Sequence, residues 1–170
     1  MTTYVSRLYK NAIKAENEII KNYIAGNDKP FNWYYGTYKE GKNEYKCVTE
    51  GHVLIAFGFD SFALDKAIFE THNQVLSNNA ISQKVNEIDA TSFESAHMVG
   101  MKVVQGAKKY TFCVLKKEST GEEILFNEKY KKYFTDDVEY KVFNDVTPIK
   151  VYSGDVFLGV IMPIKDKRHD

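Results

Sequence analysis

The side chains of this chain that could do covalent or metal chemistry are two cysteines and four histidines. Cys47 and His52 lie close in sequence, and a nucleophilic cysteine needs a base within reach. They lie on either side of an expected turn, and no oxyanion-hole sequence accompanies them. A cysteine enzyme is therefore a third alternative, behind two binding functions, and we expect a protein that is not an enzyme.

The other histidines favour no metal site. His72, His97 and His169 lack the spacing of metal ligands, and two cysteines are too few for a structural zinc site. Glycine-rich phosphate loops are absent as well, so we expect no metal and no cofactor. Cys47 and Cys113 both lie in apolar, strand-like sequence, which predicts two buried free thiols and no disulfide.

Composition limits the range of partners. The chain has 23 basic and 23 acidic side chains, so a DNA contact would have to come from a local basic patch. The length of 170 residues favours one domain with a real core. No apolar run is long enough to span a bilayer, and residues 1–10 lack the apolar core of a signal peptide. We therefore expect a cytoplasmic protein without a membrane partner.

The first half of the chain reads as a helix followed by strands. Apolar residues at helical spacing predict a helix from Ser6 to Ala25, and its other face carries Arg7, Lys10, Lys14 and Lys21, interrupted by two glutamates. Taken alone, this face is an ordinary solvated surface. Strands are expected over 31–38 and 45–49, a tight turn at 50–52, a helix over 61–83 and a short strand over 101–104.

The second half is predicted in more detail. A strand is expected over 109–116, and Asn127 is a good N-cap for a short helix that places Tyr130, Tyr133 and Phe134 on one face. Lys129, Lys131 and Lys132 occupy the rest of that helix. Alternating residues then predict strands over 138–143, 149–152 and 156–162, the last two joined by a hairpin turn at Ser153-Gly154-Asp155.

This order resembles a domain of the bacterial DNA sliding clamp, the beta subunit of the replicative polymerase. Phe126-Asn127 with Tyr130, then Pro148-Ile149, then Val160-Ile161-Met162-Pro163 follow the closing half of the clamp's last domain. Upstream, the sequence from Val48 to Leu54 is similar to the clamp's Ala-Thr-Asp-Gly-His-Arg-Leu turn, with Glu50 for Asp and Val53 for Arg. The resemblance implies an α+β, processivity-fold domain over 1–170, with antiparallel sheets, two helices on one face, and residues 60–106 as an inserted helical segment.

The resemblance also implies two binding surfaces. Clamp helices face the phosphate backbone of duplex DNA without reading bases, which assigns DNA binding to these residues: Arg7, Lys10, Lys14, Lys21, Lys129, Lys131 and Lys132. Clamps hold polymerases through an apolar peptide pocket, which is implied at these positions: Thr49, Gly51, His52, Leu54, Val160, Met162, Pro163 and Ile164. The loss of Arg at Val53 weakens that second assignment, and in the family the two segments come from neighbouring domains.

Two functions follow from this interpretation. The first is a non-catalytic DNA-replication accessory of a phage or mobile element, which acts as a clamp-like tether by self-association around DNA or by docking to replication proteins. The alternative is a protein-binding regulatory module that keeps the clamp fold without encircling DNA, and pairs with its partner through a sheet edge.

Overall fold

The computed structural model describes residues 4–25, 30–57, 66–76, 80–134 and 137–165, and of residues 4–12 and 80–81 it describes the backbone alone. Contacts divide the chain into two compact units, Met1–Glu87 and Ile88–Asp170. Both belong to a mixed α+β fold with antiparallel strands, as expected from the sequence. The boundary lies within the segment 60–106, and the assignment of 1–170 to one clamp-like domain stays a prediction.

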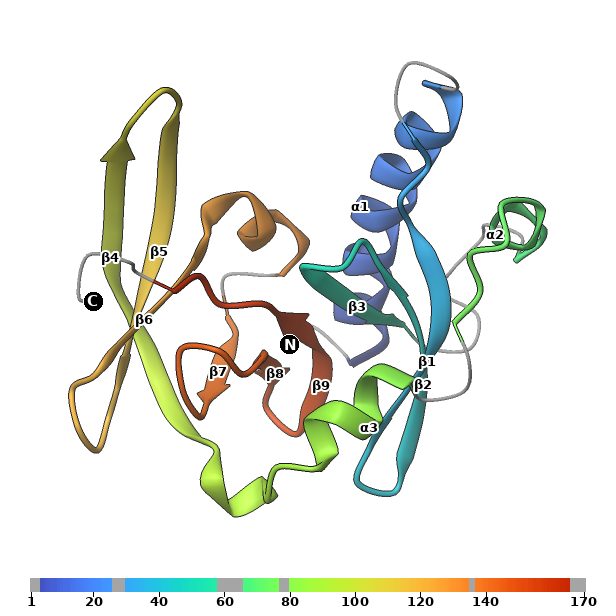
Figure 1. The fold of residues 1–170 in the computed structure, drawn as a ribbon. Coiled ribbons are helices and arrows are strands. Elements are labelled where there is room, and N and C mark those ends of the chain that lie inside the picture. Colours follow the sequence, from blue (N-terminus) through green and yellow to red (C-terminus); the bar gives the residue numbers. More distant parts are fainter. Residues whose placement is uncertain (1–3, 26–29, 58–65, 77–79, 135–136, 166–170) are drawn as a thin grey trace. The chain divides into compact units, whose positions relative to one another are not determined.

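Unit 1 is a long helix packed on a three-stranded antiparallel meander (Figure 1). The helix α1 (Tyr4–Ile24) lies against β3 (Val53–Phe57) and buries Ala15 and Ile19, which are one helical turn apart. The strands β1 (Tyr34–Glu40) and β2 (Asn43–Thr49) form a hairpin with a turn at Gly41 and Lys42, and β2 then pairs with β3. All five residues of β3 are buried, so this strand is the centre of the unit's core.

The helix expected over 61–83 is interrupted: among the described residues, 67–71 and 80–83 are helical, and 72–76 are not. Two short helices, α2 (Ala67–Thr71) and α3 (Ala80–Asn86), lie on either side of an extended stretch. Asn73 has a φ of 55°, a left-handed conformation that ends α2. The backbone then pairs with β1, because Tyr35 N donates to Gln74 O and Leu76 N donates to Tyr35 O. Contacts with a distant strand thus override the helical spacing at Val75 and Leu76, whereas Ala67 and Ile68 are helical as expected.

Unit 2 contains six antiparallel strands in the order β9-β8-β7-β4-β5-β6. A 3-10 turn, η2 (Ala90–Ser92), precedes the strands, and a 3-10 helix, η3, follows β6 where the sequence predicts a short helix. The elements have these bounds: β4 (Glu94–Gln105), β5 (Lys109–Lys117), β6 (Glu123–Asn127), η3 (Glu128–Tyr133), β7 (Glu139–Val142), β8 (Ile149–Ser153) and β9 (Val156–Ile161).

The strand β4 is three times as long as the sequence predicts, because its 12 residues replace the four expected over 101–104. It pairs with β5 over most of its length and forms a hairpin that extends from the rest of the unit (Figure 1). Gly100, which would precede a strand over 101–104, lies within β4 at a bulge, where the pairing with β5 skips Val99 between Met98 and Gly100. A bulge allows a strand to continue past a residue that interrupts the alternation of side chains.

The same order of elements occurs once in each unit. In unit 1, α1 is followed by the meander β1-β2-β3, and in unit 2, η3 is followed by the meander β7-β8-β9. In both meanders the strands are joined by hairpin turns, including the expected one at Gly154 and Asp155. The repeat is one of topology, since the two segments show no repeat in sequence.

Candidate functional site

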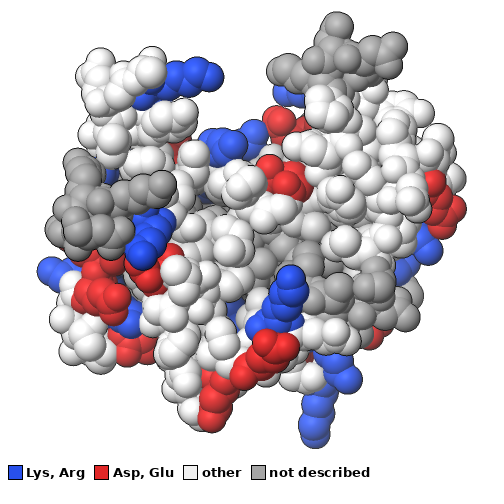
Figure 2. Space-filling view, viewed as in Figure 1, with Lys and Arg blue, Asp and Glu red and all other residues white. Residues whose placement is uncertain are grey.

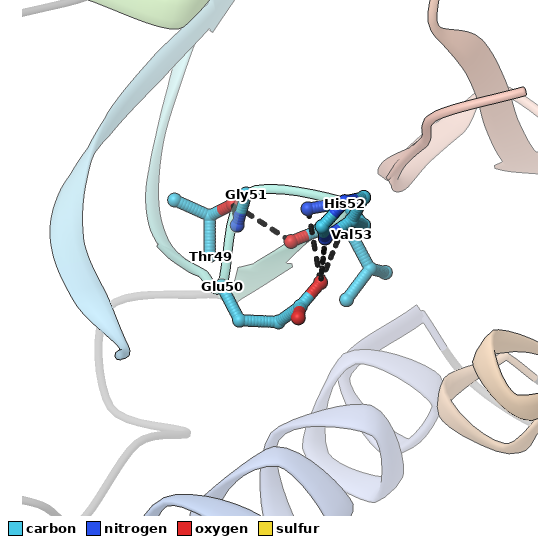
Figure 3. Close-up of polar contacts among 5 residues, drawn as sticks. All are labelled: Thr49, Glu50, Gly51, His52 and Val53. Carbon is cyan, nitrogen blue, oxygen red and sulfur yellow. Dashed lines mark hydrogen bonds and ion pairs between the residues drawn. The ribbon is translucent and has the colours of Figure 1, made fainter. Parts of the chain in front are cut away.

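The turn between β2 and β3 is held by its own side chains (Figure 3). One carboxylate oxygen of Glu50 accepts hydrogen bonds from the backbone amides of His52 and Val53, at 2.9 and 3.2 Å. The same oxygen lies 3.5 Å from Nδ1 of His52. The hydroxyl of Thr49 donates to the carbonyl of Val53 at 2.8 Å and accepts from the amide of Gly51 at 3.1 Å. Glu50 and Thr49 are therefore engaged in shaping the turn.

The turn offers little apolar surface to a partner. Thr49 and Leu54 are buried, while Gly51 and His52 are exposed. The other residues implied for the peptide pocket lie at the end of β9 in unit 2, where Val160 is buried and Met162, Pro163 and Ile164 are half-buried. The Ile164 amide also donates to Leu125 O at 2.7 Å, which ties this segment to β6. The eight residues are thus divided equally between the two units.

Gly51 is the residue on which the shape of the turn depends. Its φ is +100°, a conformation that other residues rarely adopt, although there is room for a Cβ atom there. We expect Gly51→Ala to lower the free energy of unfolding by about 1–3 kcal/mol through backbone strain. Gly106→Ala is the matched control, because Gly106 lacks a positive φ and a Cβ atom there would lie 4.0 Å from its nearest neighbour, the carbonyl oxygen of Lys108. Urea denaturation of both variants measures the difference, and equal losses would contradict this explanation.

The four basic residues of α1 differ in their surroundings and in whether their side chains are described. Arg7 and Lys10 lie on the helix, within the part for which only the backbone is described. Lys14 is exposed, and Lys21 lies 3.8 Å from Glu18 in an exposed pair one turn apart. Ion pairs at the surface hold their two side chains together only weakly.

In η3 the three lysines differ in their environments. Asn127 caps the element as predicted, because its side chain accepts from the Lys129 amide at 3.1 Å. The amines of Lys129 and Lys132 are 4.9 and 5.0 Å from the ring centres of the buried Tyr130 and Tyr133. These cation–π contacts anchor two lysines that are exposed. Lys131, in contrast, is half-buried and lines a cavity.

This cavity, of about 550 Å³, was not foreseen in the sequence. It lies entirely within unit 2, between β4, η3, β7 and the turn after β5, and these residues line it: Ser95, Ala96, His97, Met98, Glu118, Lys131, Val138, Glu139 and Tyr140. Four of them belong to the part of β4 that the sequence interpretation left unassigned. The alternation of apolar and polar residues from Ala96 to Met98 was the available signal, but it is only three residues long.

The cysteines are buried and free, as predicted. Burial raises the pKa of the Cys47 thiol to about 12, whereas a nucleophilic cysteine needs a lowered pKa. The pKa of Cys113 is also raised by burial, against a lowering influence of Lys131. His72 and His97 are exposed, and His169 lies outside the described residues. Among the described residues, none of the acidic, histidine and cysteine side chains gathers into a group that could hold a metal ion.

Charges of both signs are interspersed on the face drawn in Figure 2, where blue and red groups lie scattered among uncharged surface. The described helices include none that is long and apolar enough to cross a membrane. Comparison of the chain with protein-family models, with curated proteins and with solved structures found no match.

Proposed function

We propose that this protein is a non-catalytic DNA-replication accessory of a phage or mobile element that tethers replication proteins to duplex DNA in the manner of a sliding clamp. The observation that carries the proposal is the repeated order of a helix and a three-stranded meander, once in each unit. A clamp-like domain built of two halves would have this order. Under this proposal residues 1–170 are one processivity-fold domain.

The lysines of these two elements support a contact with phosphates. Lys14 on α1 is exposed, and so are Lys129 and Lys132 on η3, whose amines lie over the rings of buried tyrosines. Phosphate contacts of this kind release counterions and need no particular base sequence. Because the net charge of the chain is zero, such an attraction depends on these local groups and not on the charge of the whole molecule.

A charge-reversal experiment tests the proposal. We expect Lys14→Glu combined with Lys129→Glu and Lys132→Glu to abolish measurable binding to a fluorescent duplex at low salt. If partial variants still bind, each lost lysine should reduce the slope of log affinity against log salt by about one. Fluorescence anisotropy at several salt concentrations, on duplexes of two unrelated sequences, measures both effects.

The control carries the same change in net charge at three other exposed lysines, Lys42→Glu, Lys84→Glu and Lys165→Glu. Equal losses in the two triple variants would mean that only overall charge matters and would contradict the assigned surface. A wild-type protein without salt-dependent DNA affinity would reject the tether itself.

One observation favours the alternative, a protein-binding module that keeps this fold without encircling DNA. The exposed side of α1 carries Ile13, Ile20, Tyr23 and Ile24, of which Ile24 is 74% exposed. An apolar helix surface of this kind suits a protein partner better than a phosphate backbone. The alternative predicts that the wild-type protein does not bind DNA, and that Ile20→Lys with Ile24→Lys leaves its folding unchanged.

A further inference from the structure

Over most of its length, one edge of the strand β4 has no backbone partner among the described residues of unit 2. β5 accompanies it on one side as far as Gln105, whereas β7 pairs on the other side only with residues 94–96. Among the described residues of unit 2, positions 97–105 therefore face no strand on that side. Such an edge presents a row of amide and carbonyl groups that another strand can pair with.

The side chains along this edge do not protect it. Val99, Met101 and Val103 are 49, 56 and 55% exposed, and Lys102 is the only lysine or arginine among residues 97–105. Its amine lies 2.8 Å from a carboxylate oxygen of Glu123 on β6, so Lys102 already has an ion-pair partner within its own sheet. A long, apolar edge without a free charge favours strand pairing between molecules.

We propose that two copies of this chain associate through the free edges of β4, paired antiparallel about a twofold axis at Val103. Residues that lie opposite each other in an antiparallel pair point to the same face of the sheet. A twofold axis perpendicular to the sheet preserves its two faces, so the axis must lie at a residue, which then faces its own copy, and not between two residues. An axis at Lys102 would set two ammonium groups opposite each other, and one at Met101 would extend into the bulge next to Met98. At Val103, the axis places Lys102 opposite Val104 of the second copy.

Charge complementarity supports a second copy as the occupant. In this register the turn after Gln105, with the exposed Lys108, lies level with Met98 of the other copy, where the cavity of unit 2 begins. Two carboxylates, Glu118 and Glu139, line that cavity together with one lysine, Lys131, so acidic groups outnumber lysines there. Figure 2 shows blue groups beside uncharged surface at the β4–β5 turn, at the upper left. The twofold makes this contact twice, with each copy's Lys108 at the other's cavity.

The association is tested by sedimentation velocity over a range of protein concentrations, without DNA. We expect a reversible dimer whose dissociation constant rises about tenfold or more in Val103→Lys, because like charges would then face each other across the axis. Val146→Lys is the matched control, since Val146 is 60% exposed and lies in the turn between β7 and β8. A monomer at all concentrations, or equal association of both variants, would overturn the pairing.

A charge swap tests the contact between the turn and the cavity. Lys108→Glu should weaken the dimer about fivefold, and Glu139→Lys in the same chain should restore it, because the exchanged charges would again attract. Weakening without restoration would overturn this part of the proposal.

The proposed dimer rests on the proposed function only in that a tether around DNA needs several copies of the chain. A monomer that still binds DNA would reject the pairing alone, whereas a dimer without DNA affinity would reject the tether alone.

Discussion

Leu54→Ala is expected to lower the free energy of unfolding by about 2–5 kcal/mol, enough to unfold much of a marginally stable unit. Leu54 was assigned by resemblance to a surface pocket, yet its side chain is only 1% exposed, in a strand whose five residues are all buried. Shortening it leaves a cavity in the core of unit 1. The loss would therefore concern folding first, and partner binding only as a consequence.

Trp33 is the probe for this experiment, because it is the one tryptophan of the chain and is buried in unit 1. Its fluorescence during urea unfolding reports the stability of that unit. His52→Ala is the matched control, since His52 lies two residues away and its side chain is 68% exposed. We expect His52→Ala to change stability by less than about 0.5 kcal/mol. Equal effects of both substitutions would contradict the burial of Leu54.

Cys47 is expected to react with a thiol reagent at pH 8 about a thousandfold more slowly in the folded than in the unfolded protein. The thiolate is the reactive form, and burial raises the pKa of Cys47 from 9.0 to about 12. The thiolate fraction at pH 8 falls accordingly by about three powers of ten. A Cys113→Ala variant isolates the reaction of Cys47, and absorbance during reaction with an aromatic disulfide measures its rate. Rapid labelling of the folded variant would contradict the burial.

The raised pKa of Cys47 also makes the free energy of unfolding depend on pH. Since the folded state holds the proton more tightly, the contribution of Cys47 is fully present below pH 9 and is lost as the pH rises from 9 towards 12. The loss amounts to at most about 1.4 kcal/mol per pH unit in this window. The free energy of unfolding of Cys47→Ala should therefore fall less steeply above pH 9 than that of the wild type. Cys113→Ala retains the contribution of Cys47 and should lose only that of Cys113, whose pKa is also raised by burial. Parallel declines in all three proteins would contradict the prediction.

Many local elements could be predicted from the sequence. The hairpin turns at Gly41 and Gly154, the cap at Asn127 and the strands around Cys47 and Cys113 all lie where the residue types indicate. Alternation of apolar residues and turn chemistry depend on neighbours within a few positions, which a single sequence contains. The same reasoning was wrong at residues 72–76, within the helix expected over 61–83, because pairing with β1 decides the conformation of residues 74–76.

The sequence by itself determined the α+β class, the two free thiols and the exposed lysines at positions 14, 129 and 132. Only the tertiary structure decided that Lys131 lines a cavity while Lys129 and Lys132 face solvent, and that Leu54 lies in the core. It also decided that β4 runs from Glu94 to Gln105 with an edge that no described strand of unit 2 covers. The reason is physical: burial and strand pairing depend on which distant segment covers a residue, and local spacing does not specify that segment.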